Sequence, residues 1–136
     1  MPISTRNGKL QIPNNPTGLI EPLLRGDVYQ VSLEPAVGGE IKKSRPAVVI
    51  QNDIGNRFSP VTIIAPISST KEITRPLPIM VIMSDGEGGL RGDGYVDCGQ
   101  IRTVDKSARL LHKWGHLSPE RMDEVERGLR ISLALK

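Results

Sequence analysis

The sequence predicts a mainly β fold, a small barrel of about six strands followed by one C-terminal helix. From residue 25 onward, short apolar runs alternate with turn residues, a pattern typical of an all-β barrel rather than of repeated βαβ units. After Ser118 the apolar spacing changes from strand-like to helical. A length of 136 residues fits one domain and leaves little room for a second.

The first 24 residues differ in character from the rest of the chain. They contain four prolines and several asparagines and glycines, with no usable periodicity. We therefore expect residues 1–24 to form a flexible N-terminal extension, with at most a short strand around residues 10–12. A single packed domain is expected over residues 25–136.

Six apolar runs account for the predicted strands. The run at 46–50 is nearly uniformly apolar, which predicts a strand buried on both faces. A helical turn is expected at residues 53–59, between two of the strands. The predicted strands are residues 28–33, 46–50, 61–67, 77–83, 95–103 and 109–113.

The C-terminal helix has a clear start signal. Ser118 is a favourable N-cap, and Pro119 suits the first helical position. Gly128 weakens the middle of this helix by up to about 1 kcal/mol relative to alanine, unless close packing requires it. An apolar stripe at helical spacing is formed by Met122, Val125, Leu129 and Leu133.

Composition excludes several classes of protein. One cysteine, Cys98, rules out an internal disulfide framework and a multi-cysteine zinc site, and its place in a strand predicts a small buried residue. Four aromatic residues are too few for an RNA-binding sheet with several stacking rings. A net charge of +3 is compatible with a phosphate-bearing partner without being diagnostic.

The chain also lacks the signals of export and membrane insertion. No window approaches the roughly 20 apolar residues that a membrane helix needs. The N-terminus has no apolar run of the secretory type, so a cytoplasmic location and no membrane partner are expected.

Two histidines flank Trp114 and Gly115 and form one candidate site. His112 and His116 could serve as general acid and base in RNA cleavage, but turn residues near the start of a helix are the favoured interpretation. No third ligand lies at a suitable spacing, so no metal is expected. The glycine-rich stretch 85–94 matches no nucleotide-binding fingerprint and is read as a hairpin connection, so no cofactor is expected.

A second candidate site combines a cation with a hydroxyl group. Arg45 stands at the entrance of the strand 46–50, and Ser68 follows the next strand, 61–67. If these consecutive strands are antiparallel, the start of one and the end of the other lie at the same edge of the sheet. Arg45 and Ser68 would then face one site, where they can bind a phosphodiester and stabilise the extra charge of a pentacoordinate transition state.

Several motifs resemble the MazF/PemK family of toxin endoribonucleases. The resemblance covers residues 25–136 in order, including the closing helix. The motifs are RGDVY at 25–29, KSRPAVVIQND at 43–53, SP at 59–60 and QIRTVDK at 100–106. It implies an SH3-like barrel that forms a homodimer, and a cognate MazE-like antitoxin whose disordered tail occupies the RNA groove. Family members cut single-stranded RNA at short sequences without a metal, leaving 2′,3′-cyclic phosphate and 5′-hydroxyl ends.

The resemblance also implies roles for particular residues. The catalytic arginine of the family falls on Arg45, and its catalytic threonine falls on Ser68, which keeps the hydroxyl and loses the methyl group. Ser69 or Thr70 could take this role after a small shift in register. Gly99 stands where the family has an acidic residue. The RNA is expected to enter a groove roofed by the loop at 38–44. Candidate RNA contacts are Lys42, Lys43, Asn52, Asn56, Arg57, Ser69 and Gln100.

Two non-catalytic functions remain as alternatives. A gyrase-binding toxin resembling CcdB would use a C-terminal tryptophan, whereas Trp114 is internal. An RNA-binding barrel without activity would show salt-sensitive binding and no cleavage.

Overall fold

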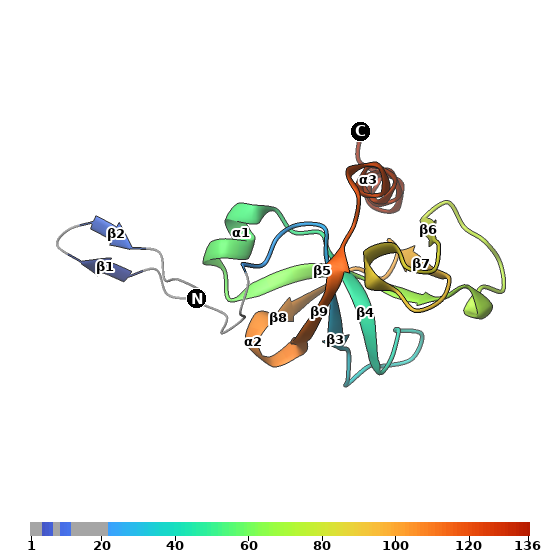
Figure 1. Cartoon of the computed structure of the whole chain (residues 1–136), viewed down its shortest axis with the longest axis horizontal. Coiled ribbons are helices and arrows are strands. Elements are labelled where there is room, and N and C mark those ends of the chain that lie inside the picture. Colours follow the sequence, from blue (N-terminus) through green and yellow to red (C-terminus); the bar gives the residue numbers. More distant parts are fainter. Residues whose placement is uncertain (1–3, 7–8, 12–21) are drawn as a thin grey trace.

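A computed structural model describes residues 4–6, 9–11 and 22–136 of the chain (Figure 1). The elements in chain order are β1 (Ser4–Arg6), β2 (Lys9–Gln11), β3 (Asp27–Ser32), β4 (Ser44–Val49), α1 (Asp53–Phe58), β5 (Val61–Ser69), η1 (Thr70–Glu72), β6 (Met80–Met83), η2 (Glu87–Gly89), β7 (Gly94–Asp97), β8 (Arg102–Asp105), α2 (Lys106–Arg109), β9 (Leu110–His116) and α3 (Pro119–Leu133). The helical turn expected at 53–59 is α1, and the helix expected after Ser118 is α3.

The main sheet has seven antiparallel strands and confirms the mainly β class. Its order is β6-β7-β5-β4-β3-β9, and β8 pairs with β5 beside this path. Among the described strands no ladder joins β6 to β9, so the sheet stays open where a closed barrel was expected. The turn η2 fills the gap, because its glycine backbone packs against β9: a Cβ at Gly89 would overlap the carbonyl oxygen of Trp114.

The strand expected at 95–103 is wrong in one respect, because the structure divides it into β7 and β8. A turn separates them, in which Asp97 Oδ1 accepts a hydrogen bond of 2.9 Å from the Gly99 N–H. The Gln100 N–H closes the same turn on the carbonyl oxygen of Asp97 at 3.3 Å. This break lets β7 and β8 pair with different halves of β5.

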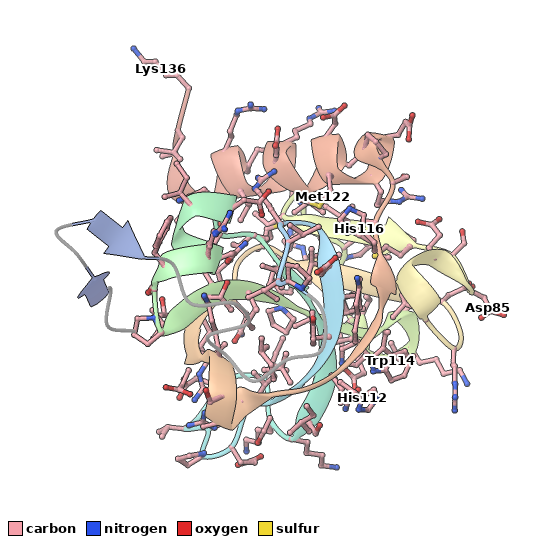
Figure 2. All side chains as sticks on the ribbon, turned by 60° about the vertical axis from the view of Figure 1, so that its left-hand side comes forward. Asp85, His112, Trp114, His116, Met122 and Lys136 are labelled. Carbon is pink, nitrogen blue, oxygen red and sulfur yellow. The ribbon has the colours of Figure 1, made fainter. Side chains whose placement is uncertain are left out.

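Helix α3 lies across one end of the sheet (Figure 2). Ser118 Oγ accepts from the Arg121 N–H at 3.1 Å, and Pro119 occupies the first turn, as the sequence predicts. Gly128 is required by packing, since a Cβ there would fall 2.8 Å from Cys98 Sγ. The cost of a helical glycine is therefore offset by close approach of the helix to the sheet.

Two apolar clusters lie on opposite faces of the strands β3 and β4. Val48 belongs to the cluster beneath α3, whereas its neighbours Ala47 and Val49 belong to the other. All three are fully buried, which confirms the prediction that this strand is covered on both faces. No helix in the described residues is long and apolar enough to cross a bilayer.

The N-terminal residues are described only in part. Strand β2 pairs with β1 close to where a short strand was expected. The rest of the expected extension up to residue 21 lies outside the described residues. Leu23 is 6% exposed and packs in the second cluster, so the packed unit includes this residue.

Cys98 should be chemically inert in the folded protein. Its side chain is fully buried, and desolvation, helped by the nearby Asp97, raises the pKa of the thiol to about 11. At pH 8 only about one thiol in a thousand is then ionised, and the thiolate is the reactive form. We expect no reaction with a disulfide reagent such as Ellman's until guanidinium unfolds the chain. Reaction within minutes under native conditions would instead indicate opening of the contact between α3 and Cys98, which lies in the turn directly after β7.

Candidate active site

Arg45 and Ser68 lie next to each other at one end of the neighbouring strands β4 and β5. Strands β4 and β5 are antiparallel, with Ala47 opposite Pro66, and two further residues along each strand put Arg45 opposite Ser68. The Nη1 of Arg45 donates a hydrogen bond of 3.1 Å to Ser68 Oγ. The juxtaposition expected from antiparallel strands is therefore present.

Both side chains are held firmly by their surroundings. Ser68 is 3% exposed, and its strand is paired on the other side with β7, where Tyr95 faces it. The Arg45 side chain is 23% exposed, and its Nε donates to the carbonyl oxygen of Lys42 at 2.8 Å. A buried hydroxyl and an anchored, partly exposed guanidinium form a preorganised pair of hydrogen-bonding groups.

An acidic residue that the sequence analysis missed completes this cluster. Glu72 ends the turn η1, and its Oε2 accepts from Arg45 Nη1 at 2.9 Å. The turn is capped by Ser69, whose Oγ accepts from the Lys71 N–H at 3.2 Å. A carboxylate four residues beyond Ser68 is thereby folded back onto the guanidinium.

These contacts leave one nitrogen of Arg45 open. Three of the five guanidinium N–H donors are engaged, through Nε and both hydrogens of Nη1. Bidentate binding of a phosphate uses Nη2 together with Nε or Nη1. Of the three partners, the Glu72 carboxylate is the one that an incoming anion would most readily displace, because it is 48% exposed and negatively charged.

A hollow of about 410 Å³, within the size range of ligand sites, is lined by Ser68 but not by Arg45. Residues 68–71 form one side, and residues 90–94 form the other. Pro46 and Trp114 also line it. The hollow therefore runs from the end of β5 that carries Ser68 to strand β9.

The loop at residues 38–44 is fastened next to this site. Lys42 and Lys43 are exposed on it, directly before Arg45. Gln100 holds the loop from the turn between β7 and β8: its Oε1 accepts from the Ile41 N–H at 3.2 Å, and its Nε2 donates to the Gly39 carbonyl at 3.1 Å. Gln100 thus positions the loop, whereas the two lysines are free to meet an anionic strand.

Three of the candidate RNA contacts lie elsewhere. Asn52, Asn56 and Arg57 belong to α1 or its cap, which precedes the start of β5, whereas Ser68 is near its end. The seven residue steps from Val61 to Ser68, at roughly 3.3 Å each, place the two about 23 Å apart along the strand. Asn56 is moreover 2% exposed, and its Oδ1 accepts from the Thr62 hydroxyl at 2.7 Å. Its amide fixes α1 on β5, so we no longer expect it to contact RNA.

The two histidines do not form an acid–base pair. His116 Nδ1 lies 2.7 Å from Oδ1 of the buried Asp27, while the His112 ring stacks on Trp114. Figure 2 shows His112 beside Trp114 and His116 apart from them, close to α3. In the part of the chain that is described, no three His, Cys, Asp or Glu side chains are grouped so as to hold a metal ion.

Comparison with known proteins gives consistent matches along the chain. The family model for PemK-like, MazF-like toxins of type II toxin–antitoxin systems matches residues 24–133. Endoribonuclease EndoA of Bacillus subtilis (strain 168) is 48% identical over 111 residues, which cover 82% of this chain and 94% of that protein.

Solved structures agree with the fold. An endoribonuclease in complex with its cognate antitoxin, from a mycobacterial species, superposes with a TM-score of 0.68 at 25% identity, over 84% of this chain and 97% of that one. MazF from Deinococcus radiodurans superposes with a TM-score of 0.72 at 20% identity, over 85% and 99% of the two chains. At 20% identity, the second match shows only that the two folds are alike.

Proposed function

Because the chain belongs to the family of PemK-like, MazF-like toxins of type II toxin–antitoxin systems, we propose that it is an endoribonuclease that cuts single-stranded RNA at Arg45 and Ser68. The observation that carries the site is the 3.1 Å hydrogen bond between these side chains, of which Ser68 lines a ligand-sized hollow. The activity is assigned to one domain, residues 25–136 together with the buried Leu23, and the residues before Leu23 are taken as an extension outside it.

The reaction is a transesterification within the RNA strand. The ribose 2′-oxygen attacks the adjacent phosphorus, the bond from phosphorus to the 5′-oxygen breaks, and the proton lost by the 2′-hydroxyl is balanced by one gained at the 5′-oxygen. The products are a 2′,3′-cyclic phosphate and a 5′-hydroxyl. DNA is not cut, because it lacks the attacking hydroxyl.

The two side chains act on the charge that develops at phosphorus. Arg45 offers Nη2, and Nη1 once Glu72 leaves it, to the non-bridging oxygens of the pentacoordinate transition state. Ser68 Oγ, already oriented by Arg45, donates its proton to one of these oxygens. No step requires a metal ion, so EDTA should leave cleavage intact.

The partners follow from the same assignment. Lys42 and Lys43 are placed to contact phosphates of the RNA strand, which makes binding sensitive to salt. A cognate MazE-like antitoxin is the expected inhibitor, supported by the mycobacterial relative in complex with its own antitoxin. We further infer a homodimer that acts in the cytoplasm.

The decisive experiment is incubation of the purified protein with long, defined single-stranded RNAs in EDTA, followed by mapping of the ends. Discrete cuts with 5′-hydroxyl ends would support the proposal and reveal the recognised sequence. Intact RNA across several long substrates would contradict it and favour the two non-catalytic functions, which binding assays with RNA and with gyrase then separate.

Replacing Glu72 with glutamine should improve substrate binding. The carboxylate occupies Arg45 Nη1 and repels the incoming phosphate, and a partly exposed ion pair of this kind corresponds to about a two- to fivefold effect. We expect KM to fall by about this factor, as measured by initial rates on a fluorogenic RNA. Glu120→Gln is the matched control, since it removes the same charge from the exposed first turn of α3. A large loss of kcat would instead show that Glu72 takes part in proton transfer.

A further inference from the structure

The hollow beside Ser68 ends on an aromatic side chain that the reaction does not use. Trp114 is partly buried on β9 and lines this hollow together with Arg91. The Arg91 guanidinium carbon lies 5.8 Å from the centroid of the indole ring, within the range of a cation–π contact. The His112 ring lies 6.1 Å from the indole at an interplanar angle of 13° (Figure 2). Three planar groups are thereby collected on one side of β9.

Trp114 also borders a second hollow, of about 500 Å³. This hollow is lined by Gln30 and by the same planar groups, so the indole stands between the two spaces. Trp114 Nε1 and Gln30 Oε1 are both buried and have no hydrogen-bond partner among the described residues. A buried donor and acceptor left unpaired are costly, so their presence at one hollow indicates a ligand that supplies both.

We infer that Trp114, flanked by Arg91 and His112, is a nucleobase-binding subsite for the RNA strand whose scissile phosphate lies at Arg45 and Ser68. This inference rests on the proposed function and assigns it a substrate contact. A nucleobase matches the site in shape, because its flat face can stack on an indole. It matches in chemistry as well, because its edge carries hydrogen-bond donors and acceptors that fit the Gln30 oxygen and the indole N–H.

Continuity and charge favour an RNA strand as the occupant. Ser68 and Trp114 line one hollow, which Arg45 does not line, so a strand held at Ser68 can reach the indole past Pro46. Lys71 and Arg91 border that path and outnumber its one acidic residue, Asp93, which suits a chain of phosphates.

Fluorescence tests the subsite directly, because Trp114 is the only tryptophan of the chain. The ligand is an oligonucleotide of the mapped cleavage sequence with 2′-O-methyl riboses, which cannot attack the phosphorus. We expect tryptophan emission to change on titration, and this change to disappear when the base at one position near the cut is replaced by an abasic site. Emission that stays constant while RNA binding saturates would overturn the inference. So would emission that follows protein concentration alone, which would assign the indole to contact with a second copy.

Variants supply an independent measurement. We expect Trp114→Leu to weaken binding of the intact oligonucleotide about tenfold and to leave binding of the abasic one unchanged, while Trp114→Phe retains most of the affinity. Leu111→Ala, at an exposed residue of the same strand outside both hollows, is the matched control. Melting temperatures confirm that each variant is folded.

The outcomes separate this inference from the function on which it rests. If Trp114→Leu binds both oligonucleotides as the wild type does and cuts the same sequence with the same KM, the subsite is overturned and the endoribonuclease stands. If the wild-type protein cuts no RNA, both are overturned.

Discussion

Replacing Arg45 with alanine is expected to lower the rate of RNA cleavage by about 10²- to 10³-fold, the cost of removing one preorganised group that stabilises transition-state charge. Arg45 is the cation that contacts Ser68, and neighbouring oxygens hold its Nε and Nη1 in place. Initial rates with a defined RNA in EDTA measure the effect. Most of the loss should be in kcat, because the charge that Arg45 stabilises is greatest in the transition state.

Two comparisons make this result specific to the site. Arg57→Ala removes an equal charge from the exposed face of α1, at the other end of the β4–β5 pair, and should leave cleavage near the wild-type rate. Arg45→Lys keeps the charge but loses the planar fork, and should recover only part of the activity. A drop of less than tenfold for Arg45→Ala would remove Arg45 from the catalytic role.

Local sequence patterns predict much of the fold because the physics behind them is local. The cap at Ser118 and the apolar stripe after it place α3, and the uniformly apolar run around Val48 predicts a strand covered on both faces. The break between β7 and β8 is missed because its one turn signal in the sequence, Gly99, stands in an otherwise strand-like run. Closure of the sheet is a long-range property, and here η2 packs against β9 in place of a strand ladder.

In the candidate site, too, sequence patterns predict some contacts and miss others. Arg45 and Ser68 can be paired from the sequence, because antiparallel neighbours put a strand entrance beside the next strand exit. Glu72 cannot be placed in this way, since it reaches Arg45 only through the short turn η1. The contact of Arg91 with Trp114 joins the 84–93 loop to β9 across the open side of the sheet, and no local pattern signals it. The small number of aromatic residues excludes a base-stacking platform of several aromatic rings. Beside Trp114, the other planar groups are the imidazole of His112 and the guanidinium of Arg91.

Ser68→Ala is expected to slow cleavage by about 10²-fold, whereas Ser68→Thr should cut at close to the wild-type rate. Alanine removes the hydroxyl that donates to a non-bridging oxygen, and it also deprives Arg45 Nη1 of the contact that orients it. Threonine keeps the hydroxyl and restricts its rotamers, so the oxygen stays near the position that the guanidinium already engages. The measurement is kcat on the same RNA used for the Arg45 variants.

The neighbouring hydroxyls decide whether this assignment is unique. Ser69 and Thr70 follow directly, but Ser69 Oγ caps η1 by accepting from the Lys71 N–H, and its side chain is exposed. Ser69→Ala should therefore loosen the turn that carries Glu72 without the loss of rate seen for Ser68→Ala. A larger loss for Ser69→Ala than for Ser68→Ala would move the catalytic hydroxyl one residue along the chain. Because a strand turns successive side chains to opposite faces, such a result would also require a different register between β4 and β5 from the one that now sets Arg45 opposite Ser68.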